Sequence, residues 1–243
     1  MALFSIADLH LSSAVSKPMD IFGARWHDHT NKIIKRWRDV VSDDDTVVIP
    51  GDISWAMSLS DAVYDLKLID SLPGRKILGK GNHDFWWETI TKMKSCLDAN
   101  DIRTISFLHN NAFAADGFAI CGTRGWYVEE RLQNTVGDVD YQKIVNRECQ
   151  RLETSIAEGE RLVSAGEAER ILVYFHFPPV FGGFICRELI DVLSAHGIKN
   201  VYFGHIHGVY NVPRTTEFEG ISFTMISADY LNFIPMITCP VDY

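Results

Sequence analysis

Five short apolar runs in this chain each lead into a residue that can bind a metal ion or transfer a proton. The runs span residues 3–7, 46–50, 76–79, 171–175 and 200–203, and each has the length and composition of a buried β-strand. Helical patterns around residues 26–41, 59–72 and 86–97 separate the first of these strands. Because strands that alternate with helices build parallel sheets, we predict an α/β fold with a mainly parallel core sheet.

The rest of the chain carries a related pattern. Residues 104–108, 112–115 and 118–122 are expected to be shorter strands, and Asp116-Gly117 is a strong hairpin signal between the last two. Residues 138–165 are expected to form one long polar helix, and strand-like sequence returns at residues 221–225. The chain has 243 residues, of which 47% are hydrophobic, so it can build a substantial core, and we predict a single domain over residues 1–243.

The residues at the strand ends form five short motifs. These are Asp8-Leu9-His10, Gly51-Asp52, Gly81-Asn82-His83-Asp84, His176, and Gly204-His205-Ile206-His207. In open α/β sheets, ligand sites form at the carboxyl ends of the strands. Residues two apart on extended backbone point to the same side, so an Asp-x-His or His-x-His segment can supply two ligands. Carboxylate, imidazole and amide ligands without a thiolate suit Mn, Fe, Zn, Ni or Co, and suit Ca²⁺ poorly.

The order of these motifs resembles the calcineurin-like metallophosphoesterase superfamily. The pattern of that superfamily is D-x-H, G-D, G-N-H-[DE], H and G-H-x-H, and every position is filled here between residues 8 and 207. An ordered match of five parts is far more specific than any one of its parts. The resemblance implies a metallophosphoesterase-type β-sandwich of mixed sheets flanked by helices, with a dinuclear metal site at the carboxyl ends of the strands.

The resemblance also implies a role for each motif residue. Two divalent metal ions would be bound, the first by Asp8, His10 and His207, and the second by Asn82, His176 and His205, with Asp52 bridging both. A hydroxide shared by the ions would attack the phosphorus of a small phosphodiester or phosphomonoester in line. His83 would be the catalytic residue that meets the leaving oxygen and either protonates it or stabilises its charge.

Two motifs distinguish the chain from the protein serine/threonine phosphatases of this superfamily. Those enzymes carry Gly-Asp-x-x-Asp-Arg-Gly at the second motif, where this chain has Trp55 and Ala56 in place of the second Asp and the Arg. Their third motif ends in Glu, whereas this one ends in Asp84. These differences favour the small prokaryotic-type phosphohydrolases and phosphodiesterases. Without the Arg, we expect a diester to be preferred over a monoester, unless Arg124 takes its place.

Three tryptophans and one arginine are candidate substrate-binding residues. Trp55, Trp87 and Trp126 lie near predicted strand ends, as Trp86 does, and could form the wall of a pocket or stack on a base. They could instead anchor helices to the sheet. Arg124 lies in a glycine-flanked loop and could bind a phosphate oxygen or form a surface salt bridge. Four histidines outside the motifs are expected to be structural: His27, His29, His109 and His196. His27 and His29, two apart in a predicted helix, would face different sides.

Composition narrows the range of partners and compartments. Lys+Arg 23 against Asp+Glu 32 gives a formal net charge of -9, and no basic cluster is evident along the sequence, so a nucleic-acid partner is disfavoured. A metal-dependent nuclease and a non-catalytic metal-binding scaffold remain alternatives to a small-molecule phosphoesterase. The five cysteines are scattered without a Cys-x-x-Cys pair, no secretory segment precedes Asp8, and no apolar run approaches the roughly 20 residues that span a bilayer. We therefore expect a cytoplasmic protein with no membrane contact.

Overall fold

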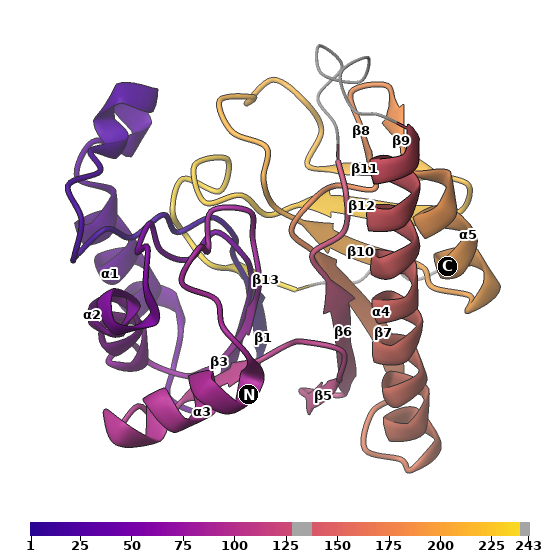
Figure 1. Ribbon diagram of the computed structural model, residues 1–243, viewed down its shortest axis with the longest axis horizontal. Helices are drawn as coiled ribbons and strands as arrows, with labels where there is room; N and C mark the ends of the chain where they lie inside the picture. Colours follow the sequence, from indigo (N-terminus) through magenta and orange to yellow (C-terminus); the bar gives the residue numbers. More distant parts are fainter. Residues whose placement is uncertain (128–137, 239–243) are drawn as a thin grey trace.

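The computed structural model describes residues 1–127 and 138–238. Its strands form two main sheets that face each other, with helices on both outer faces (Figure 1). The first sheet contains β1 (Leu3–Ser5), β2 (Thr46–Pro50), β3 (Arg75–Gly79), β4 (Ile105–Phe107) and β13 (Met236–Ile237), in the order β13-β1-β2-β3-β4. β1 to β4 run parallel, and β13 pairs antiparallel with β1.

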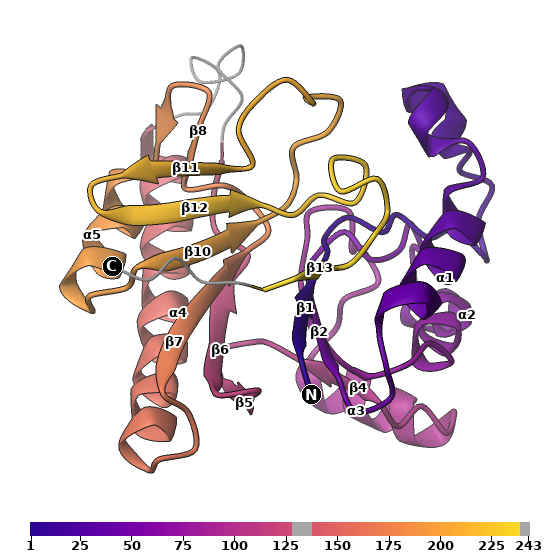
Figure 2. The same ribbon diagram turned by 180° about the vertical axis from the view of Figure 1, so that it is seen from behind.

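The second sheet is also mixed. It contains β5 (Phe113–Ala115), β6 (Phe118–Thr123), β7 (Arg170–Phe175), β10 (Asn200–Phe203), β11 (Thr215–Phe218) and β12 (Ile221–Met225), in the order β11-β12-β10-β7-β6-β5 (Figure 2). The four central strands are parallel, and an antiparallel hairpin closes each edge. Asp116 and Gly117, with φ of 52° and 84°, make the predicted turn between β5 and β6. A small hairpin of β8 (Val180–Phe181) and β9 (Phe184–Ile185) lies outside both sheets.

Helices cover the two outer faces of the sandwich. α1 (His29–Val40), α2 (Leu59–Asp70) and α3 (Ile90–Ala99) cover the first sheet, and α4 (Asp138–Ser164) and α5 (Arg187–Ala195) cover the second (Figure 1). Two 3-10 helices, η1 (Met19–Phe22) and η2 (Ala24–Trp26), precede α1. None of the helices in the described part of the chain is long and apolar enough to span a membrane.

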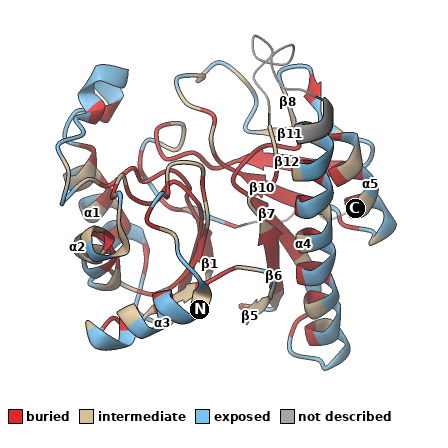
Figure 3. Cartoon of the chain, viewed as in Figure 1, coloured by how far each residue is buried: buried red, intermediate tan, exposed pale blue. Residues whose placement is uncertain are grey.

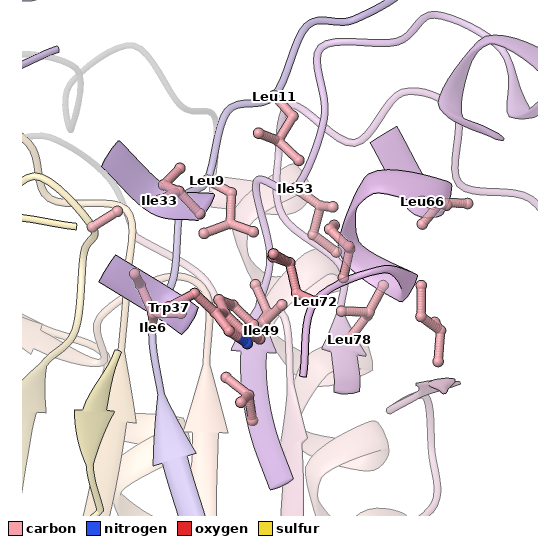
Figure 4. Close-up of a cluster of buried hydrophobic side chains, with 14 of the residues drawn as sticks. Ile6, Leu9, Leu11, Ile33, Trp37, Ile49, Ile53, Leu66, Leu72 and Leu78 are labelled. Carbon is pink, nitrogen blue, oxygen red and sulfur yellow. The ribbon is translucent and has the colours of Figure 1, made fainter. Parts of the chain in front are cut away.

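Alternating side chains along the strands separate three layers of buried residues. In β2, Val47 and Ile49 pack under the helices of the first sheet, whereas Val48 packs between the two sheets. In β7, Leu172 likewise faces the first sheet and Val173 faces α4 and α5. Figure 3 shows the resulting pattern, with buried strands and helices that are exposed on one side. Figure 4 shows the outer layer of the first sheet, where side chains of the strands meet those of α1 and α2.

The mixed-sheet sandwich predicted from the sequence is confirmed, with differences at some elements. The predicted helix over residues 26–41 is interrupted, because Asp28 adopts a left-handed φ of 53° and α1 begins only at His29. His27 and His29 therefore do not share a helix, and His27 is exposed while His29 is buried. The helix expected over residues 86–97 begins at Ile90, since the motif turn extends through Trp87.

The long helix α4 is less polar than expected. One face, which includes Val145, Leu152 and Ile156, is buried against the second sheet. α5, β8, β9 and β11 were not predicted from the sequence, whereas β13 lies in the tail that was expected to be β-like from residue 221 onward. Cys96, Cys121, Cys149 and Cys186 are free thiols, and Cys239 lies outside the described residues.

Candidate metal centre

The two sheets are joined directly beside the first motif. Ala7 and Ser227 form an isolated parallel bridge, and the backbone nitrogen of Ala7 donates to the carbonyl oxygen of Ile226 at 2.8 Å. The motif loops follow β1, β2 and β3 of the first sheet and β7 and β10 of the second. Loops from both sheets therefore deliver side chains to the same place.

Asp8, His10 and His207 form the first of two candidate metal-binding groups. Asp8 and His10 follow β1, whereas His207 follows β10 of the other sheet. One ligand atom from each residue lies within 4.8 Å of the others, and Nε2 of His10 is 3.3 Å from Nε2 of His207. Two imidazoles that converge on a carboxylate are a ligand set that a divalent cation can occupy.

Asp52, His176 and His205 form the second group, again with ligand atoms within 4.8 Å of one another. Asp52 follows β2, while His176 and His205 follow β7 and β10. The amide oxygen of Asn82 lies 2.6 Å from Nε2 of His176 and adds a further oxygen beside this group. The structure thus brings the predicted metal ligands together in two neighbouring groups.

The carboxylate of Asp52 faces both groups. Its Oδ2 lies 3.6 Å from Nε2 of His10, and its Oδ1 lies 3.5 Å from Nε2 of His176. Oδ1 also accepts a hydrogen bond from the backbone nitrogen of His83, at 2.8 Å. Oδ2 is buried and has no hydrogen-bond partner among the described residues. A buried carboxylate oxygen without a donor is costly, and a cation at this position would satisfy it.

Four of the predicted ligands have an unusual backbone conformation. Asp8, His10, Asp52 and His205 have positive φ values of 62°, 47°, 51° and 71°. This left-handed region is uncommon outside glycine, and such residues gather at functional sites where the surrounding structure holds them. At His205 the backbone nitrogen donates to Oδ2 of Asp8 at 2.8 Å, so one predicted ligand fixes the backbone of another.

Two glycines of the motifs make room for ligand carboxylates. A Cβ atom at Gly81 would collide with the side chain of Asp52. A Cβ atom at Gly204 would lie 2.7 Å from Oδ2 of Asp8. The glycines predicted from the sequence to allow tight turns therefore also allow the loops of the centre to approach one another.

Burial controls the protonation of the centre in the absence of cations. It lowers the pKa of His10 and His176 well below the ordinary value, and it lowers the pKa of His205 to about 3. Burial also raises the pKa of Asp8 to about 6, and burial together with the neighbouring Asp84 and Asp8 carboxylates raises that of Asp52. These three imidazoles are therefore neutral at pH 7, which is the form that binds metal ions.

Asp229 orients His207. Oδ1 of Asp229 accepts a hydrogen bond from Nδ1 of His207 at 2.9 Å, which leaves Nε2 facing His10. Oδ2 of Asp229 accepts from the backbone nitrogen of Gly208 and from the hydroxyl of Tyr210. Burial alone would lower the pKa of His207, but the hydrogen bond to Asp229 and the charge of Asp8 outweigh it and raise that pKa. A carboxylate behind a metal-binding histidine is a common second partner of such ligands.

His83, the predicted catalytic residue, is half-buried beside the two groups and packs against Trp55. The ring centroids of His83 and Trp55 are 4.2 Å apart, and Trp55 also stacks on His10 at 5.0 Å. Nζ of Lys17 lies over the Trp55 ring, 4.5 Å from its centroid. Burial, His207 and Lys17 lower the pKa of His83. Trp55 thus positions His83 by packing, where protein phosphatases are expected to use a carboxylate.

The neighbouring tryptophans of the third motif have different surroundings. Trp86 is buried in the core, and its Nε1 donates to Oδ1 of Asp84 at 3.0 Å, so it anchors the loop. Trp87 is half-buried, packs on Phe107 and lines a separate cavity. Only Trp87 of this pair is placed where it could contact a ligand.

Trp126 and Arg124 lie on the side of the second group. Trp126 packs on Phe177, whose ring centroid is 4.6 Å from that of His205 and 4.9 Å from that of His176. The guanidinium of Arg124 is 5.7 Å from the Phe177 ring, and Arg124 lines the same cavity as Trp87. The four predicted substrate-binding residues therefore do not form one wall, because Trp55 lies by the first group and the others lie beyond the second.

Three residues near the centre were missed from the sequence. Asp229 is far from every motif and has no local signal. Trp26 was placed only in a helix, yet its ring lies 5.7 Å from His10 and 5.4 Å from His207. Asp84 was noted only as a variation of the third motif, although it accepts hydrogen bonds from both motif loops. The position of Asp84 at the end of the third motif was the one signal in the sequence that could have indicated this role.

Three of the four histidines expected to be structural have ordinary partners, and the fourth, His109, lines the same cavity as Trp87 and Arg124. Nε2 of His29 lies 3.2 Å from the carbonyl oxygen of His10. His27 lies 3.5 Å from Asp20, and His196 lies 2.8 Å from Glu160. None of these three belongs to the candidate metal-binding groups of the described residues.

The family model of calcineurin-like phosphoesterases matches residues 1–209 of the chain, a range that contains every motif of the centre. The chain belongs to the calcineurin-like phosphoesterase family. Membership of this family supports hydrolysis of a phosphoester with the help of divalent metal ions, and the two groups of ligands are where such ions can be held.

Relatives of known sequence or structure resemble the chain more distantly. The Gene 66 protein of Mycobacterium phage L5 is 37% identical over 78 residues, which are 32% of this chain and only 37% of that protein. A phosphopantetheinyl hydrolase of Mycobacterium tuberculosis superposes with a TM-score of 0.50 and 15% identity, covering 96% of this chain and 90% of the other. The protein TT1561 of Thermus thermophilus gives a TM-score of 0.54 at 11% identity, covering 94% and 89%. At these identities the two structures support the fold alone.

Proposed function

We propose that this calcineurin-like phosphoesterase holds two divalent cations and hydrolyses a small phosphodiester or phosphomonoester. The observation that carries the proposal is the position of Asp52, whose two oxygens face the two groups of ligands. One carboxylate between two sites is the arrangement needed to hold two cations that would otherwise repel each other. One neighbour in fold is a phosphopantetheinyl hydrolase, which is consistent with a phosphoester substrate.

The proposed ligands follow the geometry. Asp8, His10 and His207 would hold one cation, while Asn82, His176 and His205 would hold the other, with Asp52 shared. Oxygen and imidazole donors without a thiolate suit Mn, Fe, Zn, Ni or Co. When bound, the cations would supply the positive charge that activates water and stabilises the phosphoryl oxygens.

The protein supplies the remaining chemistry through its own side chains. His83 lies at the edge of the centre, where its imidazole can donate a proton to, or stabilise, the oxygen that leaves phosphorus. Trp55 packs on His83 and restricts its rotation, which keeps it in position for this role. Asp229 fixes the tautomer of His207, and Asp84 fixes the loop that carries Asp52.

A diester is the proposed preference between the two substrate classes. A monoester dianion needs positive charge on its terminal oxygens, which protein phosphatases supply with an Arg at the position of Ala56. Here Ala56 is buried, and Arg124 faces a cavity beyond Phe177. Trp55, beside His83, offers apolar surface to a second organic arm.

The proposed function is tested by metal content and turnover together. Protein prepared with added Mn²⁺ should contain about two equivalents of metal and hydrolyse bis-p-nitrophenyl phosphate. Asp52→Asn should lower both, whereas Asp39→Asn, an exposed control with a surface ion pair, should change neither. One equivalent in the wild type, unaltered by Asp52→Asn, would refute the dinuclear proposal. Bound metal without turnover of any activated ester would support the non-catalytic scaffold.

A further inference from the structure

A cavity of about 470 Å³ lies where the two sheets adjoin, and none of the proposed metal ligands lines it. Pro50 and Gly79, the last residues of β2 and β3, line it together with the end of β6 and two arginines of α4, Arg147 and Arg151. In Figure 1, β3 and β6 belong to the two facing sheets, and α4 lies beside β6. The volume is within the range of roughly 300–1,000 Å³ that is typical of small-molecule sites.

Four cationic side chains converge on this cavity: Lys80, Arg124, Arg147 and Arg151. They come from the end of β3, the loop after β6, and α4, so they are far apart in the sequence. No basic cluster is evident along the sequence, and this one forms only when the fold brings three separate segments together. The chain as a whole has a formal net charge of -9, so the positive charge at this cavity is opposite in sign to that of the whole chain.

Few carboxylates neutralise this cluster. Arg151 pairs with Glu148 at 2.7 Å, and Glu148 also accepts a hydrogen bond from Thr123. Glu88, the one acidic residue among those that line the cavity, is exposed and pairs with Lys92. Among the described residues, Lys80, Arg124 and Arg147 have no carboxylate within ion-pair distance.

Two buried hydrogen-bond donors in the lining also lack an acceptor among the described residues. Nε of Arg124 and Nε1 of Trp87 are buried and have no hydrogen-bond partner in the part of the chain that the structure describes. Burial and the neighbouring Arg147 and Arg151 lower the pKa of Arg124, although Glu148 partly opposes this shift. Unpaired donors and mutually repelling cations are both stabilised by an anion.

The cavity is next to the metal centre. Lys80 precedes the third motif by one residue, and Arg124 lies over Phe177, which contacts His176 and His205. Phe177 thus lies near both Arg124 and the second group of candidate ligands. Two ends of a single small substrate could occupy the cavity and the metal centre together.

We propose that this cavity is an anion subsite that binds a second phosphate of the substrate, remote from the phosphoester that is hydrolysed. Lys80, Arg124 and Arg147 would contact the phosphate oxygens, and Trp87 would donate a hydrogen bond from Nε1. The substrate class is therefore a phosphoester that carries a further phosphate on its organic arm. This inference rests on the proposed function, because the scissile group must lie at the metal centre.

Three matched esters test the subsite. They are the p-nitrophenyl ester of thymidine 5′-phosphate, the same ester with a phosphate on its 3′-hydroxyl, and the same ester with a 3′-acetyl group. All release p-nitrophenolate, so a difference between them reports on the 3′ substituent alone. The metal-loaded wild type should show a kcat/KM about tenfold or more higher for the 3′-phosphate, mostly through KM, and no such gain for the neutral acetyl group.

Variants of the lining should reduce that preference. Arg147→Gln, an exposed position on α4, and Lys80→Gln should each lower the ratio of kcat/KM for the 3′-phosphate over the acetyl ester by roughly fivefold. Arg161→Gln is the matched control, because Arg161 is on the same helix and pairs with Glu158 outside the cavity. That variant should keep the full preference.

The outcomes separate the subsite from the proposed function. Equal kcat/KM for the three esters in an active wild type would overturn the subsite and leave the function intact. If none of the three esters is hydrolysed, the proposed function is wrong. Calorimetry with inorganic phosphate then tests the anion subsite by itself, and a Kd for phosphate that is unaltered by Arg147→Gln and Lys80→Gln would overturn the subsite. A further outcome is that inorganic phosphate binds in a manner that the two variants weaken, while kcat/KM shows no preference for the 3′-phosphate ester. In that outcome the cavity binds an anion from solution and not a part of the substrate, which overturns the substrate assignment.

Discussion

Oδ2 of Asp84 accepts a hydrogen bond from the backbone nitrogen of Asp52, at 2.9 Å. The same carboxylate accepts from the backbone nitrogens of Ile53, at 2.9 Å, and Gly81, at 2.8 Å. Asp84 is buried and takes no direct part in either group of ligands. It holds the second and third motif loops in register, and with them the carboxylate proposed to bridge the cations.

Replacing Asp84 should therefore disturb the centre without removing a ligand. Asp84→Asn keeps the size of the side chain but places an amide donor among backbone donors, which leaves buried groups unpaired. We expect a loss of about 2–4 kcal/mol in the free energy of unfolding and a lower metal content. Urea unfolding and elemental analysis measure the two effects. Asp98→Asn, at an exposed site, is the control, and a variant as stable and as metal-rich as the wild type would contradict the role of Asp84.

Asp229 should tune metal affinity through His207. Asp229→Asn can still accept a hydrogen bond from Nδ1 of His207, so it removes the charge and keeps much of the geometry. We expect the affinity for the cations to fall about 10- to 100-fold, as for other carboxylates behind metal-binding histidines. Competition with a chelator measures this change. Asp191→Asn, an exposed carboxylate on α5, should leave affinity unaltered, and equal affinities in both variants would argue against the orienting role.

His83 should act on the leaving oxygen and not on the cations. His83→Ala should keep the metal content and lose on the order of 10² to 10⁴ in rate with a poor leaving group, but less with p-nitrophenolate, which leaves without a proton. Because the pKa of His83 is lowered, its acidic form declines as the pH rises through a value below 6.5, and the rate with a poor leaving group should fall over that range. Loss of metal in this variant, or equal losses with both leaving groups, would refute the acid role.

The preference for diesters can be measured directly. Bis-p-nitrophenyl phosphate should be hydrolysed with a higher kcat/KM than p-nitrophenyl phosphate. Trp55→Ala should raise KM for the diester more than for the monoester, because Trp55 offers apolar surface beside His83. Trp87→Ala and Trp126→Ala are compared in the same way and should have smaller effects, since neither ring contacts His83. A monoester preference that Arg124→Ala abolishes would replace the diesterase proposal with a phosphatase.

Removal of the cations should affect stability differently at different pH values. In the metal-free protein the pKa of Asp8 is about 6, above its ordinary 3.8, so folding takes up a proton there and this group's contribution to stability falls as the pH rises from about 4 to about 6. Cations bind the charged carboxylate and compete with that proton. The rise in Tm on adding Mn²⁺ should therefore be larger at pH 7 than at pH 5. Equal rises at both pH values would show that Asp8 does not titrate in competition with metal.

Local sequence patterns predicted the first and last residues of several strands correctly. β2, β10 and β12 have the bounds expected from the sequence, since each is a short stretch rich in apolar and β-branched or aromatic residues. α5 was missed because it has only nine residues, too few for its buried positions, Leu189, Ile190 and Leu193, to establish a helical period.

The motif residues could be placed together because strand ends of parallel sheets converge, which is a property of the fold and not of any one residue. The partners of the motifs could not be predicted in this way. Asp229 meets His207 across a turn of irregular backbone, and Lys80, Arg124 and Arg147 meet only when the two sheets dock. Contacts of this kind depend on tertiary structure, which local periodicity does not record.

The first group of ligands joins distant segments of the chain, since His10 and His207 are separated by 197 positions in the sequence. A contact of such long range is expected to form late in folding, because closing a long loop costs conformational entropy. Bound cations would then link the two sheets and slow the separation of one sheet from the other. In the metal-free protein, proteases should therefore cleave the chain where the two sheets meet before either sheet unfolds.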